Sequence, residues 1–123
     1  MNLNLSDDQR MMRENFARFL TEESSMSRVR AAQPGGFDQR LWQGLADMGA
    51  FSMRVPEASG GLELGLLDAA VFMEEVGRTL ASGPVAETLV ATRLLALLGA
   101  ESQAALLDDA MSGLRLGHRE ALR

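Results

Sequence analysis

The stretch between Pro84 and Gly99 constrains the fold most, because it is apolar on nearly every side of a helix. Its apolar residues include Val85, Ala86, Leu89, Val90, Ala91, Leu94, Leu95, Leu97 and Leu98. Proline is favoured in the first turn of a helix and glycine just after the last turn, so these two residues mark its ends. A helix that is apolar all round is normally buried among others. We therefore predict a central helix over residues 84–98 that the rest of the chain covers on most sides.

Other segments also repeat their apolar residues at helical spacing, and strand-like alternation is rare. The helices that they predict run from Ser6 to about Thr21, from Asp38 to Met48, from Leu66 or Asp68 to Leu80, and from Glu101 to Met111. The first of them opens with Ser6-Asp7-Asp8-Gln9, a capping box in which side chains pair with the free amides of the first turn. The predicted fold class is all-α, a bundle of about five helices.

The connecting segments carry turn residues instead. Glu22 to Gly36 is predicted to be a loop with at most a short helical turn around residues 26–31. Ala50 to Val55 is predicted to be short and extended, because a following proline disfavours the α conformation at Val55. Pro56 to Gly61 is predicted to be a turn. The apolar residues of 114–123 do not recur at the spacing of a helix or a strand. We therefore predict a helical domain over 1–113 and an unpatterned tail over 114–123.

Composition excludes several classes of protein. The chain has 123 residues and no cysteine, which excludes disulfides, thiolate metal sites and iron–sulfur clusters. It has 12 basic and 17 acidic residues, a net charge of −5 and no basic run. Phosphate neutralisation carries most nucleic-acid affinity, so we expect no nucleic-acid binding. No leader or membrane-length apolar segment is visible, and we expect a soluble, cytoplasmic protein that does not bind membranes.

No catalytic constellation is visible in the sequence. The single histidine, His118, lies in the unpatterned tail. Adjacent carboxylates such as Glu74-Glu75 point about 100° apart on a helix, so they do not chelate a metal ion together. The glycines of residues 60–65 follow no long strand and lack the lysine of a phosphate-binding loop. Arg28 and Arg30 could hold a ligand phosphate, although solvated loop charges are the commoner case. We assign no catalytic, cofactor-binding or metal-binding residue.

An ordered series of motifs nevertheless resembles a known family. Leu41-Trp42-Gln43-Gly44-Leu45-Ala46-Asp47-Met48-Gly49 is followed by Val55-Pro56-Glu57-Ala58-Ser59-Gly60-Gly61. An acidic helix over 68–78, the long apolar helix that ends at Gly99, and Glu101-Ser102-Gln103 come next. This series is similar to the amino-terminal helical domain of the acyl-CoA dehydrogenases over about residues 3–113. Ala58-Ser59 depart from the family's usual residues before the paired glycines.

The resemblance implies a role in a FAD-dependent oxidoreductase of fatty acid metabolism. In that family a β-domain holds the flavin and a carboxy-terminal bundle carries the catalytic glutamate, and neither resembles a part of this chain. The resemblance implies that the domain forms one wall of the acyl-CoA pocket in which α,β-dehydrogenation takes place. The lining positions map onto Glu87, Val90, Ala91 and Leu94. These residues could equally be plain core. We expect the chain alone to bind no FAD and to be inactive.

Two interpretations of the whole chain stay open. It is either part of such an enzyme, whether a natural remnant, a frame-shifted product or an excised domain, or a stand-alone helical module that docks on a companion flavoprotein chain. In both cases an unpaired apolar face predicts self-association. No motif indicates the length or identity of the acyl group.

Overall fold

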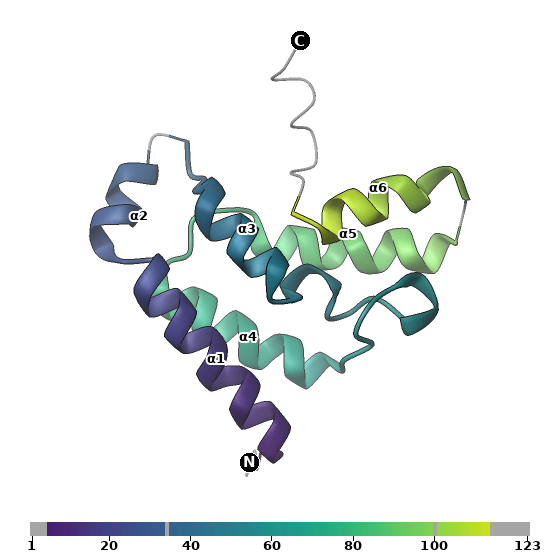
Figure 1. The fold of residues 1–123 in the computed structure, drawn as a ribbon, viewed down its shortest axis with the longest axis horizontal. Coiled ribbons are helices and arrows are strands. Elements are labelled where there is room, and N and C mark those ends of the chain that lie inside the picture. The colour runs from purple at the N-terminus through teal and green to yellow at the C-terminus, as the bar shows by residue number, and fades with distance from the viewer. Residues whose placement is uncertain (1–4, 34, 100, 114–123) are drawn as a thin grey trace. The chain divides into compact units, whose positions relative to one another are not determined.

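The computed structural model describes residues 5–33, 35–99 and 101–113, and the side chains of all of these except 101–103. Within these ranges the chain forms six α-helices and two short 3-10 helices, and no strand (Figure 1). The elements are α1 (Asp7–Glu23), α2 (Met26–Ala32), α3 (Gln39–Asp47), η1 (Ala50–Ser52), η2 (Glu57–Ser59), α4 (Leu66–Thr79), α5 (Val85–Leu98) and α6 (Glu101–Met111). The all-α prediction is confirmed. The predicted tail and His118 lie outside the described residues.

The helices fall into two compact units, which we describe one at a time. Among the described residues, unit 1 comprises 5–33, 35–41 and 65–83, and unit 2 comprises 42–64, 84–99 and 101–113.

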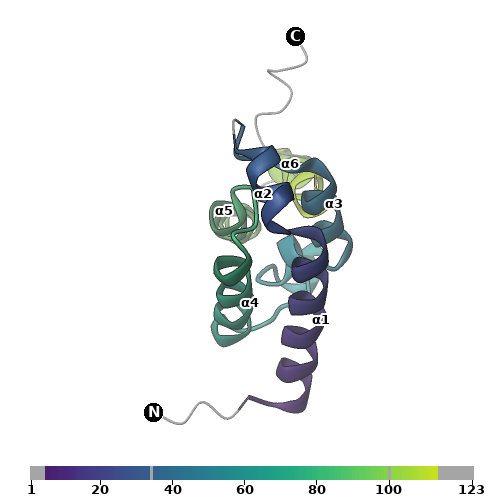
Figure 2. The same cartoon turned by 90° about the vertical axis from the view of Figure 1, so that its left-hand side faces the viewer.

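Unit 1 is built on α1 and α4, which are distant in sequence and lie side by side (Figure 1 and Figure 2). The rings of Phe16 and Phe72 pack between them, tilted by 56° with their centroids 4.6 Å apart. Beyond the end of α1, the Ser24 hydroxyl donates a hydrogen bond of 2.9 Å to the carbonyl of Thr79. Aromatic burial and this hydrogen bond therefore fix one helix on the other at two separate points.

Serine caps start two of the helices in unit 1. The predicted capping box of α1 is confirmed, because Ser6 and Gln9 each accept the other's backbone N–H. The helix ends two residues later than predicted, at Glu23. The loop prediction is wrong for residues 26–32, where the anticipated helical turn extends into α2. The Ser25 side chain caps α2 by accepting the N–H of Arg28, and the helix-forming residues that follow then continue the turn.

Unit 2 has its core around Trp42 and Phe51, whose ring centroids are 4.2 Å apart and whose side chains are fully buried. The prediction of an extended segment over 50–55 is wrong, because residues 50–52 curl into η1. The N–H of Ser52 donates to the carbonyl of Gly49 at 3.2 Å, which closes the curl. The curl buries Ala50, Phe51 and Met53 together, whereas an extended strand would alternate their directions.

The predicted turn over residues 56–61 is confirmed, with η2 at its centre. Gly60 has a φ of +90°, a conformation that a side chain disfavours. Gly61 is required for a different reason. A Cβ at this position would lie 2.1 Å from the carbonyl oxygen of Val55, inside any permitted contact. The turn thus depends on close backbone approach as well as on backbone conformation.

Helix α5 is confirmed between Pro84 and Gly99, but the prediction that it is covered on most sides is wrong. Its contacts within unit 2 are with α6 and η1, which also contact each other. These neighbours leave one side of the helix open. Large apolar side chains are exposed along it, namely Val90 (59%), Leu94 (55%), Leu97 (61%) and Leu98 (67%). No helix in the described part of the chain is both long enough and apolar enough to traverse a bilayer.

Candidate functional site

The predicted pocket residues lie together on the open side of α5. Glu87, Val90, Ala91 and Leu94 follow one another at intervals of three, one and three residues, which places them on one face of a helix. Leu97 and Leu98 continue that face toward the carboxy-terminal end. We call these six residues the outer face of α5. Leu98 follows Glu87 by eleven residues, so at a rise of 1.5 Å per residue the face is about 17 Å long.

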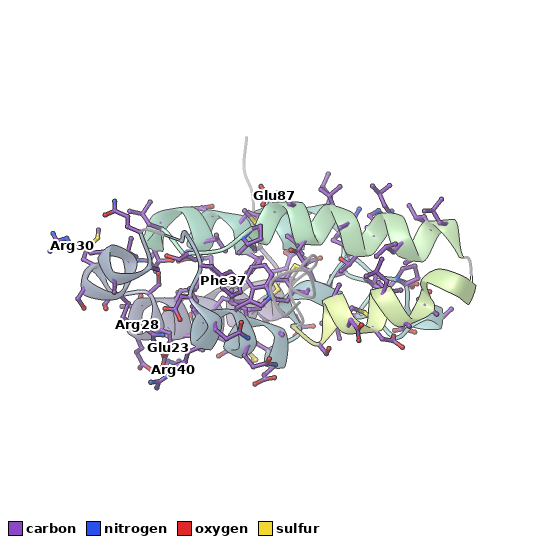
Figure 3. All side chains as sticks on the ribbon, turned by 90° about the horizontal axis from the view of Figure 1, so that it is seen from above. Glu23, Arg28, Arg30, Phe37, Arg40 and Glu87 are labelled. Atoms are coloured by element: carbon purple, nitrogen blue, oxygen red, sulfur yellow. The ribbon has the colours of Figure 1, made fainter. Side chains whose placement is uncertain are left out.

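The outer face is apolar except at its amino-terminal end. Val90 and Leu94 are more than half exposed, Ala91 is half-buried and Glu87 is exposed. The Glu87 side chain makes no hydrogen bond or ion pair with any other residue that the structure describes. Figure 3 shows it near the start of α5. The face therefore combines one carboxylate with a stripe of aliphatic side chains, and exposed stripes of this kind mark binding surfaces.

The two threonines of α5 lie on its buried side, opposite to what their polarity suggests. Thr88 and Thr92 are buried, with relative exposures of 7% and 0%. Their hydroxyls donate to backbone carbonyls within the same helix, from Thr88 to Pro84 at 2.7 Å and from Thr92 to Leu89 at 3.1 Å. Because these hydroxyls are satisfied locally, they can face the core at little cost. The sequence pattern did not predict the exposed leucines, because the buried side of the helix carries the threonines.

Two arginines form a chain of contacts that starts on α5. It runs to the segment before the glycine turn and then to the segment after it. Arg93 donates from its Nη1 to the carbonyl of Arg54 at 3.1 Å. Arg54 in turn donates from its Nη1 to the carbonyl of Leu64 at 2.9 Å. Neither guanidinium has a carboxylate within ion-pair distance in the described ranges. Both are half-buried, so unit 2 carries two positive charges there without a neutralising partner.

A cluster of charges in unit 1 was the other candidate. Arg28 pairs with Glu23, and its Nη2 lies 2.8 Å from a carboxylate oxygen of Asp38. Arg40 approaches the same Glu23 oxygen at 3.4 Å. Figure 3 shows Glu23, Arg28 and Arg40 gathered together. The cluster contains two cations and two anions, so the possible phosphate-holding role of Arg28 is not supported. Arg28 is also not a solvated loop charge, because it bridges the end of α1 to the start of α3.

An open cavity of about 330 Å³ lies beside this cluster. It is lined by Arg28, Ala31, Ala32, Phe37, Asp38 and Gln39. Its two charged residues are already paired with each other, and Asp38 also accepts the N–H of Leu41 as the cap of α3. These groups are occupied in holding the helices, so the cavity presents no spare charge for a ligand.

The glycine turn has its backbone amides engaged, and the described carboxylates do not gather into a group of metal ligands. Every backbone N–H from Ser59 to Leu64 donates within the turn segment, at 2.7–3.0 Å. A phosphate cradle needs such N–H groups free to point at the ligand, so this turn does not fit the pyrophosphate of a dinucleotide. No group of three or more metal-ligating side chains occurs within the described ranges.

The comparisons with known proteins agree with the order of motifs. The sequence matches the family description "Acyl-CoA dehydrogenase, N-terminal domain" over residues 6–113. The chain belongs to the acyl-CoA dehydrogenase family. It is 34% identical over 121 residues to benzylmalonyl-CoA dehydrogenase of Aromatoleum aromaticum, a match that covers 95% of this chain and 32% of the relative. It is 32% identical over 114 residues to acyl-CoA dehydrogenase IpdE2 of Mycobacterium tuberculosis, covering 90% of this chain and 36% of that one.

A solved structure shares the fold. A glycine-to-alanine variant of the Tcur3481-Tcur3483 steroid ACAD superposes with a TM-score of 0.79 at 32% identity, covering 89% of this chain and 31% of that chain. The chain therefore spans about a third of the length of the relatives that it matches. It is similar to their amino-terminal helical domain, and the full-length enzymes of this family use FAD and act on acyl-CoA.

Proposed function

We propose that the first half of the outer face of α5 forms one wall of the acyl-CoA pocket in a complete acyl-CoA dehydrogenase, which carries out α,β-dehydrogenation. One observation carries this proposal. Glu87, Val90, Ala91 and Leu94, the positions that the family resemblance selects, share a single solvent-accessible face. Three of the four are aliphatic, and apolar walls with few polar groups are typical of pockets that bind apolar ligands.

In this role the residues of the chain bind and shield rather than catalyse. The aliphatic side chains would contact the acyl group and exclude water from it. The chain would contribute no group that exchanges a proton with the substrate. The engaged amides of the glycine turn do not fit the pyrophosphate of FAD, which supports the proposal that the flavin and its chemistry belong to other parts of the enzyme. We expect the chain alone to be inactive and to hold no flavin.

A second arrangement is that the remaining parts of the enzyme lie on a companion flavoprotein chain. The chain spans about a third of its relatives, and the name of the structural neighbour joins Tcur3481 with Tcur3483. Both facts favour the view that this domain works with further polypeptide. The net charge of −5 supports the expectation that nucleic acid is not a partner. A cytoplasmic location is part of the same proposal.

A chimera tests the pocket wall. Residues 6–113 of this chain would replace the matching segment of the Aromatoleum enzyme, and benzylmalonyl-CoA would be added under anaerobic conditions while bleaching of the flavin is followed. Ala91→Trp places a large ring on the proposed wall. We expect it to slow bleaching at least tenfold because the acyl group loses its space, while flavin content stays unchanged.

The matched control is Ala70→Trp, on the exposed side of α4 in unit 1. It adds the same volume away from the outer face and should leave bleaching as in the unmodified chimera. Equal rates for the two variants would contradict the proposal. If the Ala91→Trp chimera contains no flavin, Leu94→Ala is measured in its place. This substitution widens the pocket at the proposed wall and should change the KM for the acyl-CoA.

A further inference from the structure

Glu87 is the one charged residue on the outer face of α5, and it does not cap the helix. It occupies the third position of the helix, after the capping residue Pro84. A glutamate at this position usually accepts a hydrogen bond from the backbone N–H of the capping residue. Proline has no N–H, so this bond cannot form. The Glu87 carboxylate is therefore exposed without a partner at the start of its own helix.

The charge on Glu87 has no neutralising neighbour in the described ranges of unit 2. These ranges contain two basic and seven acidic residues. The basic residues are Arg54 and Arg93, which donate to backbone carbonyls, and Arg93 lies about 120° from Glu87 around the helix. The positive end of the helix dipole also favours an anion in the first turn, where Glu87 lies. A ligand on the outer face therefore meets a negative potential near Glu87.

The proposed reaction decides which end of the acyl group meets Glu87. Removal of the α-proton in α,β-dehydrogenation places negative charge on the thioester carbonyl, and a carboxylate beside that charge would raise the barrier. The thioester therefore has to lie away from Glu87. Leu94 follows Glu87 by seven residues, so the proposed wall is about 10.5 Å long. An acyl group that lies along it brings its far end, the end remote from the thioester, to Glu87.

We propose that Glu87 sets the substrate class, selecting acyl groups that carry a hydroxyl group at the far end and rejecting acyl groups that end in a carboxylate. A hydroxyl donates to an ionised carboxylate, and such charge-assisted hydrogen bonds are strong. A hydrocarbon end would bury the carboxylate without a partner, which is unfavourable. A terminal carboxylate would bring two like charges together. This inference rests on the proposed function, because it names the acyl group that the wall would contact.

Three acyl-CoA compounds that differ only at the far end test this selectivity in the chimera described above. They are 3-phenylpropanoyl-CoA and its para-hydroxy and para-carboxy derivatives, which share the benzyl group in the name of the Aromatoleum relative. Anaerobic flavin bleaching gives a rate constant divided by KM for each compound. Relative to the unsubstituted compound, we expect a value at least threefold higher for the hydroxy compound and at least tenfold lower for the carboxy compound.

Removing the charge of Glu87 should change this order. Glu87→Gln should raise the value for the carboxy compound at least tenfold and change that for the unsubstituted compound by no more than threefold. The matched control is Glu57→Gln, which removes the same charge from an exposed residue of η2 in unit 2 and should leave the order unchanged. If the Glu87→Gln chimera contains no flavin, Glu87→Ser is measured in its place. For a compound that does not bleach the flavin, the change in flavin absorption on binding gives a dissociation constant instead.

Four results would each overturn the proposal. They are an order of preference that the loss of the Glu87 charge leaves unchanged, a carboxy compound that reacts or binds as well as the hydroxy compound, an equal effect of Glu57→Gln, and no binding of any of the three compounds. The Ala91→Trp chimera separates this inference from the wall itself. If Ala91→Trp slows bleaching while Glu87→Gln leaves the order unchanged, the wall stands and the selectivity is wrong. If Ala91→Trp has no effect, the wall is contradicted as well.

Discussion

At the scale of single residues, Gly61 has the closest neighbours to an added Cβ among the glycines in the described ranges. Its added Cβ would lie 2.1 Å from the Val55 carbonyl oxygen and 2.4 Å from the Val55 Cβ. Backbone and a β-branched side chain cannot move aside as a flexible side-chain end can. We therefore expect Gly61→Ala to lower the free energy of unfolding by about 2 kcal/mol or more, as measured by urea denaturation followed by tryptophan fluorescence.

Gly77 provides the matched control for this substitution. It lies in α4, and a Cβ there meets no atom within 4 Å. Gly77→Ala should leave stability unchanged or raise it by up to about 1 kcal/mol, because alanine is the better helix former. If the two alanine variants had the same stability, the close approach at Gly61 would not be a real constraint.

At the scale of elements, α5 has two faces of similar hydrophobicity and opposite burial. Leu89 is 7% exposed and Leu97 is 61% exposed on the same helix. Leu89→Ala should lower the free energy of unfolding by about 3 kcal/mol, because it removes buried atoms and leaves a cavity. Leu97→Ala should change it by no more than about 0.5 kcal/mol. Thermal or urea unfolding of the chain measures both, and a large loss for Leu97→Ala would mean that the outer face is covered within this chain.

The ends of the elements were predictable where a local group sets them. The Ser6 capping box, Asp38 before α3 and Gly99 after α5 act on their nearest backbone groups, so the sequence reveals them. The failures are tertiary. Ala50 to Ser52 curls because Phe51 has to reach the Trp42 ring, and no local signal encodes that contact. The exposed side of α5 could not be read from polarity, because Thr88 and Thr92 face inward.

At the scale of the whole molecule, the family could be recognised from the order of motifs, but the pocket could not be derived from it. Glu87, Val90, Ala91 and Leu94 were mapped from the family, and their joint place on one exposed face of α5 agrees with a lining role without testing it. Spacing alone could not separate a pocket wall from core, because both use aliphatic residues three and four apart. The difference depends on what packs against the helix, which the sequence of one domain does not contain.

The most direct test of this account is the visible absorption spectrum of the purified chain after mixing with excess FAD and removing the unbound cofactor. The account treats the chain as a helical domain that contributes a wall to the acyl-CoA pocket, while other parts of the enzyme hold the flavin. It predicts a colourless protein without a flavin band. A flavin band that stays with the protein at a stoichiometric level would contradict it, because the backbone amides from Ser59 to Leu64 are already engaged in hydrogen bonds.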